Sequence, residues 1–132
     1  MASRALTTWS EKLVAKLSDK AYRVAYVQQH VKTWIAYQIR ALRDQRGWNQ
    51  GKLAAEMQKP QSVVSRIEDP DYGKLTLQTL FEVASAFDVA VVITFVDYKT
   101  FLAKSRNVSR SEMRVASFSA ASLRARNQQP RP

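Results

Sequence analysis

The first 46 residues contain neither glycine nor proline, so nothing in this stretch interrupts a helix. Apolar side chains recur there at spacings of three and four residues, which is typical of one face of a helix. They are Ala21, Val24, Val27, Val31, Ile35, Ile39 and Leu42. Ser18 and Asp19 can cap the start, and Gly47 suits the end. The pattern predicts either one long helix or two that break near residues 32–33, with a shorter helix over residues 10–17 before them.

Two short helices are predicted after this stretch. Asn49 can cap a helix over residues 50–57. Residues 58–60 then form a short turn, in which Pro60 is well placed beside the start of a helix over residues 61–68. Two short helices joined by a three-residue turn are the geometry of a helix-turn-helix.

A fourth helix follows a dense cluster of turn residues at positions 69–73. Thr76 can cap this helix, which we expect over residues 77–87. Its apolar spacing predicts a buried face made of Leu77, Leu80, Val83, Ala84 and Phe87.

The period of the pattern changes at residues 89–96, which are rich in β-branched and aromatic side chains. This composition predicts a β-strand. A lone strand in a helical chain has unpaired edges, and a second copy of the chain is the simplest partner for it. The alternative is a fifth core helix. The Ser- and Arg-rich residues 103–132 predict a basic tail that is disordered in solution and able to form a short helix on contact.

The formal net charge of +10 favours a polyanionic partner, nucleic acid before membrane. The charge is uneven: residues 1–33 carry +4, residues 34–97 carry −1 and residues 98–132 carry +7. A DNA-binding domain in the middle would therefore bind through a local patch, helped by basic flanks. The alternative interpretation is that the charge only keeps the chain soluble.

Several classes of protein find little support in the composition. The chain has no cysteine, which excludes disulfides and thiolate metal sites. No run approaches the length of a membrane span, and the N-terminus lacks the apolar core of a secretory signal. The one histidine, His30, belongs to no catalytic cluster. We expect a cytoplasmic protein that is not an enzyme and uses no metal or cofactor.

Residues 39–89 hold a characteristic set of side chains at fixed spacing: Arg43, Gly47, Asn49, Gln50, Leu53, Ala54, Gln61, Ser62, Val64, Ser65, Ile67, Glu68, Leu77, Leu80 and Ala84. With this set the segment resembles a known family, the Xre or lambda-repressor-like DNA-binding domains of phage and bacterial regulators, which implies a bacterial or phage origin. Together with the patterning, the resemblance predicts a mainly α fold: a lambda-repressor-like helix-turn-helix domain whose C-terminal strand pairs across a dimer. We expect an N-terminal extension over residues 1–33, this domain over residues 34–102 with its strand at 89–96, and the tail over residues 103–132.

The resemblance also implies roles for individual residues. Helix 61–68 would enter the major groove, where glutamine can pair with adenine and arginine with guanine. A glutamine at a helix N-terminus can hold a phosphate. The expected DNA-binding set is Gln50, Lys52, Lys59, Gln61, Ser62, Ser65 and Arg66. Arg43 and Glu68 match a structural pair that fixes the recognition helix.

Two departures from the family affect the turn. Gln58 stands where the family usually has glycine, so it must either adopt a left-handed backbone or reshape the turn. Lys59 replaces an apolar residue and is free to reach a phosphate, and Pro60 replaces the usual Ser or Thr cap.

Three functions fit this reading. The first is a sequence-specific transcriptional regulator that binds double-stranded operator DNA as a homodimer, most often as a repressor. The second is an antitoxin of a type II toxin–antitoxin module, which binds a cognate toxin and represses its own operon. The third is an architectural or phage-encoded protein that uses the tail for non-specific binding.

Overall fold

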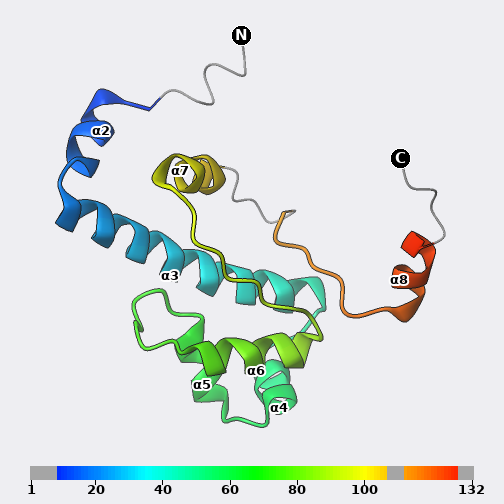
Figure 1. Cartoon of the computed structure of the whole chain (residues 1–132). Coiled ribbons are helices and arrows are strands. Elements are labelled where there is room, and N and C mark those ends of the chain that lie inside the picture. Colours follow the sequence, from blue (N-terminus) through cyan, green and yellow to red (C-terminus); the bar gives the residue numbers. More distant parts are fainter. Residues whose placement is uncertain (1–8, 107–111, 128–132) are drawn as a thin grey trace.

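The computed structural model describes residues 9–106 and 112–127, and every regular element in these two ranges is a helix (Figure 1). The helices are α2 (Glu11–Leu17), α3 (Lys20–Gln45), α4 (Gln50–Met57), α5 (Gln61–Ile67), α6 (Leu77–Phe87), α7 (Tyr98–Arg106) and α8 (Ala120–Asn127). The long helix α3 runs through the predicted break at residues 32–33 as one element. The predicted mainly α class is confirmed.

Polar side chains cap the starts of four helices. Each accepts a hydrogen bond from the backbone N–H three residues later, which satisfies one of the donors left unpaired at a helix start. The capping residues are Ser10 for α2, Asp19 for α3, Asn49 for α4 and Thr76 for α6. Gly47 follows the end of α3 with a φ of 66°, a left-handed conformation that glycine adopts without strain.

The main core lies between the C-terminal half of α3 and helices α4, α5 and α6. Its buried members are Ile39, Leu42, Leu53, Ala54, Met57, Val64, Ile67, Val83 and Phe87. Trp48 stacks on Phe87, with ring centroids 5.3 Å apart. Because α3 supplies one wall of this core, the positions of α4 and α5 are fixed relative to the longest helix.

The N-terminal half of α3 packs against α2 and α7 instead. The α7 residues Phe101 and Leu102 are buried, and the edge of the Phe101 ring faces His30 on α3. The guanidinium of Arg106, at the end of α7, lies 3.7 Å from the centroid of the Trp9 ring. Helix α3 therefore packs against two groups of helices, one on each half of its length.

The strand predicted over residues 89–96 is not formed. This segment has no regular secondary structure and crosses α3 as an irregular trace between α6 and α7 (Figure 1). The alternative of a fifth core helix is also wrong for these residues. A strand requires a neighbour that completes its hydrogen-bond ladder, and the described part of one chain holds no other strand.

The prediction of a buried face on α6 is wrong for one residue. Val83, Ala84 and Phe87 are buried as expected, and Leu80 is partly buried, but Leu77 is half exposed. Leu77 lies in the first turn of α6, where the helix borders a cleft rather than the closed core.

The basic region after residue 102 contains more order than the sequence pattern predicts. Residues 103–106 complete α7, and residues 120–127 form α8. Between them, the backbone N–H of Phe118 donates to the Asp88 carbonyl at 2.8 Å, and that of Val115 donates to Gln45 Oε1 at 3.0 Å. Residues 107–111 and 128–132 of the predicted tail lie outside the described residues.

Candidate nucleic-acid interface

Helices α4 and α5 are joined by a tight turn whose first residue has a left-handed backbone. Gln58 has φ 56° and ψ 42°, so it takes the conformation that glycine usually supplies. The N–H of Gln58 donates to the Ala55 carbonyl at 3.1 Å, and the N–H of Lys59 donates to the Ala54 carbonyl at 2.9 Å. These bonds close the end of α4. Gln58 thus keeps the tight turn, although the left-handed conformation strains the backbone of a residue that has a Cβ.

Helix α5 separates its side chains into two faces. Val64 is fully buried and Ile67 nearly so, which anchors the inner face in the core. The polar residues on the other side are exposed: Gln61, Ser62, Ser65 and Arg66. A short helix that is held by its apolar side and presents four polar residues to solvent is suited to entering a groove of DNA.

The start of α4 lies against the start of α5. A Cβ on Gly51 would be 3.4 Å from Asn49 Oδ1 and 3.9 Å from Gln61 Oε1, so both polar side chains approach the Gly51 backbone closely. Gln50 is the first residue of α4 and is partly exposed. The positive end of the α4 dipole, Gln50 and Gln61 therefore converge at one place, which favours an anionic partner there.

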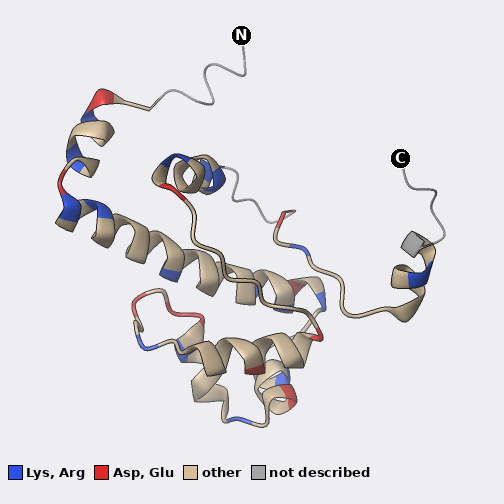
Figure 2. Ribbon diagram, in the orientation of Figure 1, with Lys and Arg blue, Asp and Glu red and all other residues tan. Residues whose placement is uncertain are grey.

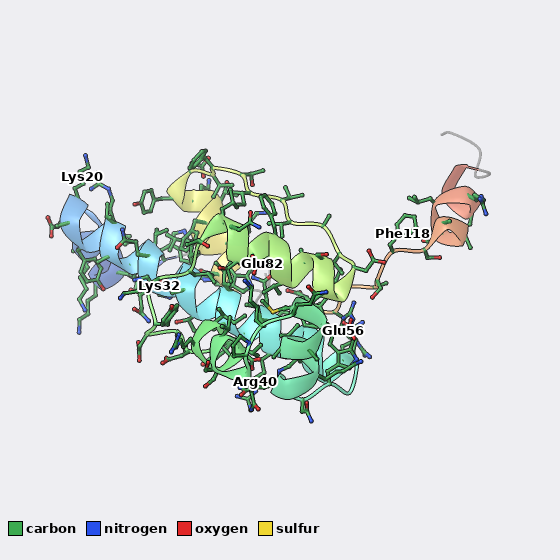
Figure 3. All side chains as sticks on the ribbon, turned by 90° about the horizontal axis from the view of Figure 1, so that it is seen from below. Lys20, Lys32, Arg40, Glu56, Glu82 and Phe118 are labelled. Atoms are coloured by element: carbon green, nitrogen blue, oxygen red, sulfur yellow. The ribbon has the colours of Figure 1, made fainter. Side chains whose placement is uncertain are left out.

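The two lysines of the expected set already have protein partners. Lys52 Nζ lies 2.8 Å from Glu56 Oε1 on the same helix, and both side chains are exposed. Lys59 Nζ lies 3.8 Å from Glu82 Oε2, which joins the turn to α6. Figure 3 shows Glu56 and Glu82 on their helices. Exposed pairs of this kind are worth about 0–1 kcal/mol, so a phosphate can compete for either lysine.

Arg43 and Glu68 connect α3 to the end of α5. Arg43 Nε and Nη2 each donate to a different oxygen of the Glu68 carboxylate, both at 2.7 Å, and Nη1 donates to the Trp48 carbonyl at 2.9 Å. Hydrogen bonds to Glu68 raise the pKa of Arg43 above its ordinary value, although burial opposes this. Both side chains are largely buried. The bidentate geometry fixes the orientation of α5 against α3.

The comparison with protein families agrees with this geometry. A family model described as Helix-turn-helix matches residues 39–92, the segment that contains α4, the turn and α5. Residues 39–92 are a helix-turn-helix domain. No curated protein and no solved structure matches the chain. The predicted Xre or lambda-repressor-like domain over residues 39–89 is thereby confirmed.

The charge pattern around the helix-turn-helix domain is uneven. Figure 2 shows Lys and Arg on α2, the start of α3, α7 and α8. Helix α4 carries Lys52 and Glu56, and α6 carries Glu82 as its one charged residue. In the part of the chain that the structure describes, no helix is long and apolar enough to cross a membrane. Nor do those residues contain a group of three metal-ligating side chains.

Sequence analysis missed a contact that joins the C-terminal region to the helix-turn-helix domain. Arg46 Nη2 donates to the Val115 carbonyl at 3.0 Å and to Ser117 Oγ at 2.8 Å. Ser117 Oγ also donates to the Phe87 carbonyl at 2.8 Å. Val115 and Ser117 are 69 and 71 residues from Arg46 in the chain, and no local pattern in a Ser-rich stretch marks which serine docks.

Proposed function

We propose that this protein is a sequence-specific transcriptional regulator, a repressor that binds operator DNA as a homodimer through α5. The observation that carries the proposal is the polar outer face of α5, held rigidly by Val64, Ile67 and the Arg43–Glu68 pair within a helix-turn-helix domain. Occupation of an operator by such a dimer would exclude polymerase from the promoter.

Each element of the proposed interface has a distinct task. Gln61 and Arg66 read base edges in the major groove, and Ser62 and Ser65 contribute shorter polar contacts. Gln50 and the backbone at the start of α4 hold a phosphate, which sets the register of α5 along the duplex. Lys52 and Lys59 exchange their carboxylate partners for phosphates. Affinity then comes from both kinds of contact, and specificity from α5.

Selection of bound sequences from random duplex DNA tests the proposal. The expected result is a single motif arranged as an inverted repeat, because a twofold dimer presents two copies of α5 about one helical turn apart. Recovery of sequences with no common motif would contradict sequence-specific binding. A motif without symmetry would contradict the homodimer.

Removal of residues 119–132 should weaken DNA binding without changing the preferred sequence. These residues carry three arginines and no acid, and cationic segments act through phosphate neutralisation and counterion release. The cut follows the docked segment 112–118, so the contacts of Arg46 remain. Titrations at several salt concentrations should show a salt slope smaller by up to about 3 per protomer. If affinity and slope stay unchanged, the segment serves another partner.

A second candidate function is the antitoxin role, and the position of α8 favours it. Figure 3 shows the segment with Phe118 leading to α8 away from the helical body. Phe118 and Leu123 are both more than half exposed there, so a protein partner could cover them. Co-expression with the product of the adjacent reading frame tests this role. A complex that requires residues 119–127 would support it, and a complex indifferent to their removal would count against it.

A further inference from the structure

A cleft lies between α3, the loop that joins α5 to α6, and α6. Its volume is about 440 Å³, which falls within the range of roughly 300–1,000 Å³ that is typical of small-molecule sites. The lining residues come from the middle of α3, the end of α5 and the loop after it, the start of α6, and Ile93. The cleft therefore belongs almost entirely to elements that surround the core of the helix-turn-helix domain.

The walls of the cleft are mainly aliphatic. On α3 they are formed by Val27, Val31 and Ile35, whose spacing of four residues places them on one face of the helix. Val27 and Ile35 are eight positions apart, so this wall is about 12 Å long. Ile35 and Leu75 also pack against the closed core, which holds the walls in place. A preformed aliphatic cleft of this length suits an unbranched hydrocarbon chain.

The charged residues that border the cleft are all exposed, and two of the three are cations. They are Lys32, Arg66 and Asp69. Asp69 Oδ1 already accepts a hydrogen bond from the backbone N–H of Asp71 at 2.9 Å. Lys32 Nζ lies beside the loop, where a Cβ on Gly73 would be 3.7 Å from it. Within the described residues, neither Lys32 nor Arg66 forms an ion pair. The solvent edge of the cleft is therefore complementary to an anionic group.

We propose that the cleft binds an aliphatic carboxylic acid, with its hydrocarbon chain along α3 and its carboxylate on Lys32. The aliphatic walls account for the chain, and the excess of cations at the edge accounts for the charge. A ligand that is polar throughout would lose its hydrogen bonds to water against these walls. An aromatic ligand fits less well, because Tyr72 is the one aromatic side chain in the lining.

Arg66 connects the cleft to DNA recognition. Its side chain borders the cleft and also belongs to the exposed outer face of α5. A carboxylate in the cleft attracts the guanidinium, because charge-assisted hydrogen bonds are the strong ones. It also adds a negative charge close to the phosphates of a bound duplex. The acid therefore weakens operator binding and acts as an inducer. This step rests on the proposed function, whereas the ligand site does not.

Isothermal titration calorimetry with octanoate tests the site. One octanoate should bind per chain, and Lys32→Gln should raise its dissociation constant about 3- to 10-fold, because an ion pair beside an apolar wall is screened less than one on the open surface. The variant should leave the constant for octanol, which lacks the charge, unchanged. The matched control is Lys20→Gln, an exposed lysine of α3 that does not border the cleft (Figure 3). Absence of octanoate binding, or a constant insensitive to Lys32→Gln, would overturn the site.

A carboxylate introduced into the wall gives a second test that does not depend on Lys32. Leu77 and Phe81 of α6 are both 50% exposed, but Leu77 borders the cleft and Phe81 does not. Leu77→Asp should raise the octanoate dissociation constant at least about 10-fold through repulsion, whereas Phe81→Asp should leave it unchanged. Circular dichroism checks that both variants fold. If octanoate does not bind and Leu77→Asp instead dissociates a dimer, a second copy covers the cleft and the inference is overturned.

Operator binding with and without octanoate, at constant ionic strength, separates this inference from the proposed function. Saturating octanoate should raise the operator dissociation constant at least about 5-fold, and the operator should weaken octanoate binding by the same factor, because such coupling is reciprocal. Octanoate that binds without changing operator affinity would overturn the role as inducer. A chain that binds octanoate but selects no DNA motif would contradict the proposed function and leave the ligand site standing.

Discussion

Arg43→Ala should lower the free energy of unfolding by about 3–5 kcal/mol, as expected when one member of a buried ion pair is removed. The substitution removes both hydrogen bonds to Glu68 and the bond to the Trp48 carbonyl. The Glu68 side chain, only 5% exposed, then keeps a buried charge without its partner. Because the pair fixes the end of α5, DNA binding should fall as well. Urea denaturation followed by circular dichroism measures the first effect.

A double substitution separates the loss of the pair from the cost of the isolated charge. Arg43→Met with Glu68→Met fills similar space with apolar groups, so it should destabilise the domain much less than Arg43→Ala alone. It should still weaken DNA binding, because the bidentate contact that orients α5 is lost. A free energy of unfolding for Arg43→Ala within about 0.5 kcal/mol of the unaltered chain, a typical surface effect, would show that the pair has no structural role.

Arg66→Ala and Gln61→Ala should each weaken binding to the selected operator by about 1–3 kcal/mol, or roughly 5- to 150-fold. Each should also relax the preference at its own symmetric pair of positions. The reason is that a side chain reading a base edge discriminates between base pairs, whereas a phosphate contact does not. Fluorescence anisotropy with the operator and its single-position variants measures both quantities. Both residues are exposed, so stability should change little.

Lys59→Ala is the matched control for these two variants. Lys59 lies in the turn beside α5, and its partner Glu82 is 3.8 Å away, so its removal should not disturb the fold. We expect it to weaken binding to all duplexes alike and to reduce the salt slope by about 1 per protomer. If Lys59→Ala changes the preferred sequence while Arg66→Ala and Gln61→Ala do not, α5 is not the element in the groove.

The helices could be predicted from the sequence because their boundaries depend on local chemistry. Asn49 and Thr76 cap α4 and α6 through their own backbone neighbours, and apolar spacing alone indicates that Val64 and Ile67 face inward. The exposed set on α5 follows from the same spacing. These features need no knowledge of distant parts of the chain.

Three structural features could not be predicted, because they depend on contacts with residues that are distant in the sequence. Residues 89–96 have the composition of a strand, but a ladder requires a second strand that the described chain lacks. Leu77 fits the apolar face of α6, yet its exposure depends on the cleft formed by α3 and the α5–α6 loop. Ser117 accepts a hydrogen bond from Arg46, and no sequence pattern links these two residues. Tertiary arrangement decides all three.

A thermodynamic cycle between protein and DNA tests whether Arg66 on α5 reads a base pair. Binding is measured for the unaltered chain and for Arg66→Ala, each with the selected operator and with duplexes changed symmetrically at one position. We expect one position at which the unaltered chain discriminates by about 1–3 kcal/mol and Arg66→Ala discriminates by at least about 1 kcal/mol less. If the effects of Arg66→Ala and of the base-pair change add to within about 0.5 kcal/mol at every position, Arg66 does not read a base pair.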